Sequence, residues 1–224
     1  MKKKKIFIAC DTTSLKKIKK IIKKTQNSKL NFGYKFGLEF LNSKNGRKFI
    51  SSLKNKITFG DYKLADIPNT CAASIKAVKD LKFNYITIHI SSGLKALKAA
   101  KKVSGSTKLI GVTILTSLDN KSLKEIGFDK NVKKLVLNQA RLAAKAKLDA
   151  VVCSPLEIKI VKKVFKKEII TPGIRLSGGK RGDQKRVTTP KQAFKNGATS
   201  IVIGRSLTEG NLSKNIQKLI KELK

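Results

Sequence analysis

Short runs of β-branched and aromatic residues alternate with longer, lysine-rich amphipathic stretches along this chain. Apolar runs of this length are typical of strands buried in a parallel sheet, and lysines around an apolar stripe are typical of surface helices. We therefore predict eight strands, at residues 5–10, 32–36, 57–61, 85–90, 108–114, 150–153, 168–171 and 200–203.

Helices are predicted between these strands, where apolar residues recur at helical spacing. The strand–helix units follow one another without a linker or a low-complexity spacer. This order predicts an α/β fold, a single (β/α)8 TIM barrel that occupies residues 1–224 as one domain, with its active site at the carboxyl ends of the strands. A doubly wound open sheet is the alternative, but no Gly-x-Gly-x-x-Gly follows the first strand. The predicted helices are 15–25, 67–81, 93–103, 131–146, 155–165 and 207–223.

Composition is compatible with one large domain. The 224 residues are 40% hydrophobic, the mean hydropathy is −0.23, and no apolar run approaches the ~20 residues of a membrane span. Lys2 to Lys5 resemble the positive flank of a secretion signal, but the apolar stretch 6–10 is too short for one. We expect a cytoplasmic protein without a membrane partner.

The net charge of +37 raises nucleic-acid binding as a competing hypothesis. Only six of the 51 basic residues are arginines, aromatic residues make up 6%, and tryptophan is absent. Lysines are spread along the chain instead of forming one stripe. Nucleic-acid readers more often use arginine forks and aromatic stacking. The pattern therefore favours a lysine-rich solvated surface over a specific nucleic-acid partner.

Three cysteines, Cys10, Cys71 and Cys153, are widely separated and form no Cys-x-x-Cys motif. An odd number cannot be fully paired within one chain. We interpret them as small buried residues in a reducing compartment, not as a metal or redox site.

The segment 59–70, Phe-Gly-Asp-Tyr-Lys-Leu-Ala-Asp-Ile-Pro-Asn-Thr, carries the strongest chemical signal. Residues two apart in a strand share a face, so Asp61 and Lys63 should point to one side and Tyr62 to the other. Asp66 lies just before Pro68, a residue that suits the first turn of a helix. A surface ion pair with Asp66 at a helix start is the bland interpretation; catalysis is the alternative.

Two later segments are suited to binding phosphate. The loop 176–184 contains three glycines, which permit a mobile backbone. Gly204 and Arg205 follow the last predicted strand and open a helix, where free N–H groups and a guanidinium attract an anion. In a barrel this position is a common phosphate site.

Asp-x-Lys-x-x-Asp-Ile-Pro-Asn-Thr resembles the signature of the orotidine 5'-monophosphate decarboxylase family. Further segments resemble that family in the same order, over essentially the whole chain: Ile-Ala-Cys-Asp at 8–11, Tyr-Lys-Phe-Gly at 34–37, Gly-Val-Thr-Ile-Leu-Thr-Ser at 111–117, Thr-Pro-Gly-Ile-Arg at 171–175, Gly-Asp-Gln at 182–184 and Ile-Gly-Arg at 203–205.

The resemblance implies decarboxylation of orotidine 5'-monophosphate to UMP, the last step of de novo pyrimidine synthesis, without a cofactor or a metal. It assigns catalysis to an alternating array, Lys35, Asp61, Lys63 and Asp66, with Lys63 as the proton donor. It also implies a homodimer, because the family's equivalent of Asp66 comes from a partner subunit, with Ile67 and Thr70 beside it. The remaining implied substrate contacts are Asp11 to the ribose, Thr116 to the pyrimidine, and Arg175, Gln184, Gly204 and Arg205 to the phosphate.

Two points stay open. Metal-dependent sugar-phosphate decarboxylases and aldolase-like enzymes of the same superfamily also carry Asp-x-Lys-x-x-Asp. They resemble this chain less, because their second strand ends in an acidic residue that helps to bind the metal. This chain has Lys35 at that position, and Glu39 lies further on. The only histidine, His89, ends a predicted strand near the barrel mouth. We expect it to make a supporting hydrogen bond instead of acting as a general base.

Overall fold

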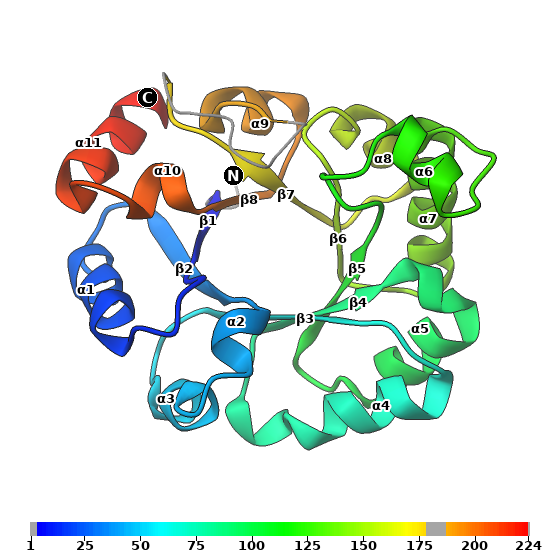
Figure 1. Cartoon of the computed structure of the whole chain (residues 1–224), viewed down its shortest axis with the longest axis horizontal. Helices are drawn as coiled ribbons and strands as arrows, with labels where there is room; N and C mark the ends of the chain where they lie inside the picture. The colour runs from blue at the N-terminus through cyan, green and yellow to red at the C-terminus, as the bar shows by residue number, and fades with distance from the viewer. Residues whose placement is uncertain (1–3, 178–186, 224) are drawn as a thin grey trace.

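The structure, a computed structural model, describes residues 4–177 and 187–223. Eight parallel strands of the described residues form a closed barrel in which each strand pairs with the next and β8 pairs with β1 (Figure 1). This architecture confirms the predicted (β/α)8 barrel. The strands are β1 Lys5–Ala9, β2 Asn31–Phe36, β3 Thr58–Leu64, β4 Tyr85–His89, β5 Lys108–Val112, β6 Ala150–Val152, β7 Glu168–Ile174 and β8 Ser200–Ile203.

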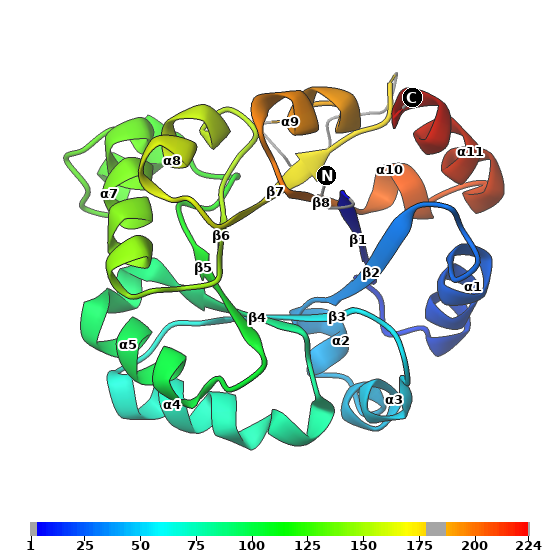
Figure 2. The ribbon, with the colours of Figure 1, turned by 180° about the vertical axis from the view of Figure 1, so that it is seen from behind.

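Helices surround the strands as an outer layer, which is visible from both ends of the barrel (Figures 1 and 2). None of the described helices is long and apolar enough to cross a membrane. The helices are α1 Leu15–Thr25, α2 Leu38–Leu41, α3 Gly46–Ser52, α4 Pro68–Ala77, α5 Gly93–Val103, α6 Asn120–Glu125, α7 Val132–Lys145, α8 Ile158–Val164, α9 Pro190–Asn196, α10 Arg205–Thr208 and α11 Leu212–Leu223, with short 3-10 turns η1 Lys79–Leu81 and η2 Ile90–Ser92.

Helix α1 shows how the sequence pattern produces the outer layer. Ser14 caps its first turn by accepting a hydrogen bond from the Lys17 amide. Ile18, Ile21 and Ile22 are buried against the barrel, and the lysines between them are exposed. The apolar stripe therefore attaches the helix, while the lysines account for the basic surface.

Two buried clusters form the core. The larger lies between the strands and the helices, and the smaller fills the inside of the barrel. Inside, the ring of Phe7 packs edge-on against Phe59 and Tyr85, with centroid separations of 5.1 and 5.2 Å. Alternate strand residues point to opposite faces, so each strand supplies both clusters. The inner cluster consists of Phe7, Ala9, Phe59, Tyr85, Ile110, Ala150, Ile170 and Val202.

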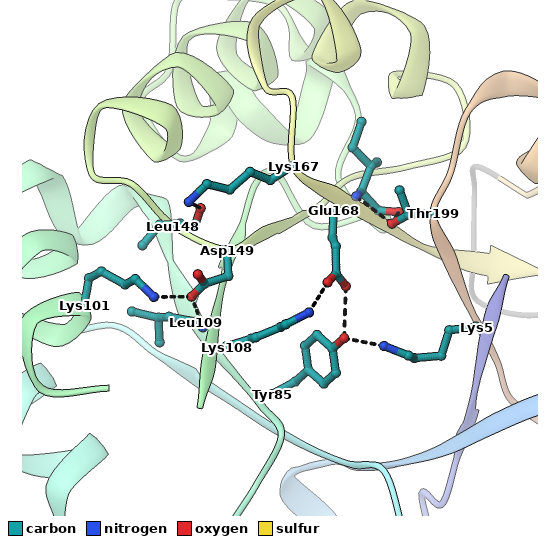
Figure 3. Close-up of polar contacts among 11 residues, drawn as sticks. Lys5, Tyr85, Lys101, Lys108, Leu109, Leu148, Asp149, Lys167, Glu168 and Thr199 are labelled. Atoms are coloured by element: carbon teal, nitrogen blue, oxygen red, sulfur yellow. Dashed lines mark hydrogen bonds and ion pairs between the residues drawn. The ribbon is translucent and has the colours of Figure 1, made fainter. Parts of the chain in front are cut away.

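Polar side chains cover the amino-terminal end of the barrel. The first residues of four strands meet there: Lys5, Tyr85, Lys108 and Glu168 (Figure 3). Lys5 donates to the Tyr85 hydroxyl, which donates to Glu168 Oε2 at 3.0 Å, and Lys108 pairs with the other Glu168 oxygen. In (β/α)8 barrels this end serves stability, which leaves the opposite end for chemistry.

Candidate active site

A cavity of about 540 Å³ opens at the carboxyl-terminal end of the barrel. Eight of the predicted site residues line it, and they follow or end β1, β2, β3, β5, β7 and β8. They come from segments far apart in the chain, and the barrel brings them to one cavity, while their roles remain predictions. These residues are Asp11, Lys35, Asp61, Lys63, Thr116, Arg175, Gly204 and Arg205.

An alternating row of charges crosses one side of this cavity. Lys35 Nζ lies 2.9 Å from Asp11 Oδ1 and 3.3 Å from Asp61 Oδ2. Lys63 Nζ lies 2.8 Å from the same Asp61 oxygen. Lys35 and Asp61 are almost fully enclosed, with side chains 10% exposed, whereas the Lys63 side chain is 32% exposed. The Lys63 ammonium is therefore the more accessible of the two cations.

Neighbouring charges favour the ionised forms of Asp61 and Lys35. Burial disfavours the Asp61 carboxylate, but Lys35 and then Lys63 outweigh burial and hold the Asp61 pKa below its usual value. Burial likewise opposes the Lys35 ammonium, but Asp61 and Asp11 outweigh it, so the Lys35 pKa is raised. The charged forms of Asp61 and Lys35 therefore stabilise each other.

Strand β3 presents Asp61 and Lys63 through an irregularity. Gly60 pairs with Ile86 and Leu64 pairs with Ile88, so three residues of β3 lie opposite one residue of β4. Lys63 has φ of +48°, a left-handed conformation that costs a non-glycine residue about 1–3 kcal/mol. Tyr62 points outward, as predicted, and its ring packs on Phe83. Strained backbone of this kind is concentrated at functional sites.

Gly37 leaves room for the Asp11–Lys35 pair. A Cβ atom at this position would lie 2.6 Å from Asp11 Oδ1 and 3.3 Å from Lys35 Nζ. The glycine that follows the Tyr-Lys-Phe run is therefore needed for close approach at the cavity wall.

Two arginines supply positive charge at another side of the cavity. Arg175 follows β7 and Arg205 follows β8, and these strands are neighbours in the barrel. Burial and then the charge of Arg205 lower the Arg175 pKa, while Glu209 opposes the shift. Two guanidinium groups that repel each other in a cavity favour a bound anion.

The segment after β3 lies outside this cavity, and its predicted role in a partner's site remains a prediction. Asp66, Ile67 and Thr70 are exposed, and none of them lines this cavity in the part of the chain that the structure describes. Asp66 Oδ1 accepts from the Ile67 amide at 2.7 Å, and α4 begins at Pro68 as expected. Gln184 lies outside the described residues.

His89 ends β4, as predicted, and is half-buried. Burial and then the charge of Lys63 lower its pKa, while Asp61 opposes the shift. The expected supporting hydrogen bond remains a prediction. The lowered pKa favours the neutral imidazole form of His89.

The three cysteines are free thiols and are buried, in agreement with their interpretation as core residues. Cys10 directly precedes Asp11. Burial raises the pKa of the Cys10 thiol to about 12, despite the opposing charge of Lys35. A thiol with this pKa is a poor nucleophile at neutral pH.

The apolar wall of the cavity was not predicted from the sequence. Phe59, Val112, Val152 and Val202 line it, together with Pro172. Their signal was the inward register of each strand, since Phe59 lies two residues before Asp61 on the same face. A cavity lined by both apolar side chains and a row of charges suits a flat ring with a polar edge.

Within residues 4–177 and 187–223, no group of three or more His, Cys, Asp or Glu side chains could hold a metal ion. Glu39 lies in α2, as expected, and is exposed.

Fold and cavity together define a (β/α)8-barrel enzyme with a charged, anion-attracting site. The model of the orotidine 5'-phosphate decarboxylase / HUMPS family matches residues 4–217, and the chain belongs to this family. The match starts before β1 and ends within α11, so it includes every element that builds the cavity.

Individual proteins with this name are similar to the chain over most of its length. A protein of Wolbachia sp. subsp. Brugia malayi named orotidine 5'-phosphate decarboxylase is 44% identical over 192 residues, which cover 83% of this chain and 84% of that protein. One of the same name from Prochlorococcus marinus (strain AS9601) is 40% identical, covering 92% and 89%. The crystal structure of orotidine 5'-phosphate decarboxylase from Lactobacillus acidophilus has a TM-score of 0.83 and 29% identity, covering 98% of this chain and 99% of that one.

Proposed function

We propose that this chain decarboxylates orotidine 5'-monophosphate to UMP and CO2, the last step of de novo pyrimidine synthesis. The observation that carries the proposal is the Lys35–Asp61–Lys63 row in the same cavity as Arg175 and Arg205. Four cations and two carboxylates line this cavity among the described residues, so it has a surplus of positive charge for a substrate with a phosphate and a carboxylate.

The chemistry requires stabilisation of a carbanion. When the bond between pyrimidine carbon C6 and the carboxylate breaks, the electron pair stays on C6 in an orbital that the ring cannot delocalise. Asp61 repels the substrate carboxylate next to it. Lys63 attracts the developing negative charge on C6 and donates an Nζ proton to it, which forms UMP. Stabilisation of charge that appears only in the transition state raises kcat.

The row fixes the proton donor before substrate arrives. Because Asp61 Oδ2 accepts from Lys63 at 2.8 Å, the Lys63 ammonium is held in place. Lys35 holds Asp61 from the other side and also contacts Asp11. Asp11, with a half-exposed side chain, is suited to accept hydrogen bonds from ribose hydroxyls. Preorganised charges of this kind do not need to reorient during the reaction.

The other end of the cavity would hold the rest of the nucleotide. Arg175 and Arg205 offer guanidinium forks for the phosphate, with the backbone of Gly204 beside them. Gln184 joins this group in the proposal. Thr116 follows β5 and is assigned to the pyrimidine. The apolar wall at Val112 and Val152 would cover the ring.

We also propose a homodimer with shared sites. Asp66, Ile67 and Thr70 are exposed beside the barrel mouth, and Ile67 is 66% exposed although it is a large apolar residue. Each chain would complete its partner's site with these three residues, so that Asp66 becomes the last member of the row. Residues 1–224 would form one domain per chain, and the free thiols support a location in the cytoplasm.

The metal-dependent alternative requires an acidic residue at the end of the second strand. Strand β2 instead places Lys35 there, and its ammonium contacts Asp61. A cation in this position opposes a divalent ion. The nucleic-acid alternative gives no role to the buried Asp61 between two lysines.

One assay tests the proposal. Purified protein is mixed with orotidine 5'-monophosphate, and the loss of substrate absorbance is followed with and without EDTA. We expect the same rate in both. Loss of activity on chelation that added Mg²⁺ restores would favour the metal-dependent reaction, and no turnover in either condition would contradict the proposal. A filter-binding assay with and without 0.2 M salt tests the nucleic-acid alternative.

A further inference from the structure

Thr87 contacts the catalytic row from a neighbouring strand. It lies in the middle of β4 and is fully buried, with 0% exposure. Its hydroxyl lies 3.1 Å from Asp61 Oδ1 and 2.8 Å from the backbone nitrogen of Lys63. One side chain therefore contacts both residues of β3 that carry the proposed chemistry.

The irregularity of β3 explains why a side chain is needed here. Asp61, Tyr62 and Lys63 lie between the Gly60–Ile86 and Leu64–Ile88 pairs, opposite Thr87. The Lys63 amide donates to the Thr87 hydroxyl, where a regular strand would use a carbonyl of its neighbour. Thr87 thus holds the backbone at the residue with φ of +48°.

The direction of each hydrogen bond follows from the groups involved. A threonine hydroxyl has one hydrogen to donate and two lone pairs to accept with. Since it accepts from the Lys63 amide, its own hydrogen is free for the Asp61 carboxylate, which can only accept. Oδ2 of Asp61 accepts from Lys35 and Lys63, and Oδ1 accepts from Thr87. The two oxygens are held from different directions, which fixes the plane of the carboxylate.

We infer that Thr87 is a positioning residue for this reaction. It sets the rotation of the Asp61 carboxylate and the backbone of Lys63, so that the Lys63 ammonium lies where the carbanion forms. Being fully buried, Thr87 does not touch the substrate and acts only through these two residues. The inference rests on the proposed decarboxylation.

Two substitutions separate the hydroxyl from the shape of the side chain. Thr87→Val keeps the β-branched shape and removes the hydroxyl, whereas Thr87→Ser keeps the hydroxyl. Thr171→Val is the matched control, because Thr171 is also a fully buried strand threonine, and its hydroxyl donates to the Cys153 carbonyl at 2.7 Å. If Thr87→Val does not fold, Thr87→Ala replaces it with the same thresholds.

Steady-state kinetics give the first readout. A lost hydrogen bond to a charged group should lower kcat by about tenfold or more. KM should stay within about threefold, since the phosphate contacts are unchanged. We expect Thr87→Ser to recover kcat to within about threefold of wild type and Thr171→Val to leave it unchanged. A Thr87→Val variant that keeps more than a third of kcat, or a serine variant as slow as the valine one, overturns the inference.

Hydrogen exchange at the Lys63 amide gives a readout that does not need turnover. Exchange should be faster by about tenfold or more in Thr87→Val and close to wild type in Thr87→Ser and Thr171→Val. Unchanged exchange in Thr87→Val contradicts the inference even if kcat of that variant falls. Wild-type protein that fails to decarboxylate the nucleotide contradicts the proposed function instead, and the exchange data then still decide whether Thr87 holds Lys63.

Discussion

The Lys63 ammonium lies 2.8 Å from Oδ2 of Asp61, a residue only two positions earlier in the same strand. If Lys63 is the cation and proton donor at the carbanion, Lys63→Ala should lower kcat by about a hundredfold or more. The fold should survive, because the Lys63 side chain is partly exposed and forms no part of the core. Steady-state rates and a thermal melt check both expectations.

Lys20→Ala is the control for this variant, since Lys20 is an exposed lysine on α1, away from the cavity. It should leave kcat at the wild-type value. If a folded Lys63→Ala variant retains more than about a tenth of wild-type kcat, a barrier change below about 1.4 kcal/mol, Lys63 is not the proton donor.

Arg205 should bind the phosphate and not the ring. We expect Arg205→Ala to lower kcat/KM for orotidine 5'-monophosphate roughly 150-fold, because a charge-assisted fork is lost. This loss corresponds to an increase of about 3 kcal/mol in the activation free energy. Turnover of orotidine, which lacks the phosphate, should change by less than about twofold. Equal losses on the two substrates would mean that Arg205 supports the structure of the β8–α10 connection instead.

Complementation between inactive variants tests the shared site. Lys63→Ala and Asp66→Asn are mixed and allowed to exchange subunits. If the two residues of a site come from different chains, each mixed dimer has one intact site and one with both defects. Random exchange makes about half the dimers mixed, so about a quarter of wild-type activity should return.

Subunit exchange must be shown separately, for example by fluorescence transfer between labelled chains. Two folded variants that exchange but remain as inactive as they were alone would place Asp66 in its own chain's site. The exposed position of Asp66 and Ile67 would then need a different explanation.

Tyr85 should make the protein sensitive to alkaline pH. Burial, followed by the neighbouring Glu168 carboxylate, raises the pKa of Tyr85 from 10.0 to about 12. Above pH 10 the unfolded chain loses this proton while the folded chain keeps it, so the free energy of unfolding falls between pH 10 and 12. Tyr85→Phe should remove part of this fall. Urea unfolding at pH 9 and 11.5 measures it, and identical pH dependence in both proteins would show that Tyr85 does not contribute.

Strand positions were predictable because buried parallel strands leave continuous apolar runs. The ends of strands and helices were less predictable. Strand β3 was predicted to end at Asp61, but it continues to Leu64, because Thr87 of β4 accepts a hydrogen bond that a regular ladder would not provide. The predicted helix 207–223 is divided into α10 and α11, and Gly210 lies in the break with φ of +69°. Helix α2 has only four residues, too few for a periodic signal.

The candidate site was likewise only partly predictable from the sequence. Asp61 and Lys63 were predictable from their spacing within one strand. Their contacts with Lys35 and Thr87 join residues more than twenty positions apart, and the pairing of β3 with β2 and β4 sets those distances. The family resemblance supplied Lys35, but no local pattern indicated Thr87, because a threonine between isoleucines in a strand is typical of any buried β-sheet.

The packed interior of the barrel closes the described part of the cavity on the side opposite its mouth. Phe7, Phe59 and Tyr85 fill the axis below the cavity, and the Lys5–Tyr85–Glu168 cluster covers the far end of the described barrel. Among the described residues, a passage along the barrel axis is thereby closed. In the proposed reaction, the nucleotide enters and the products leave through this mouth. For that proposed reaction, the time that the product stays bound in the cavity sets an upper limit on kcat, however fast the carbon–carbon bond breaks.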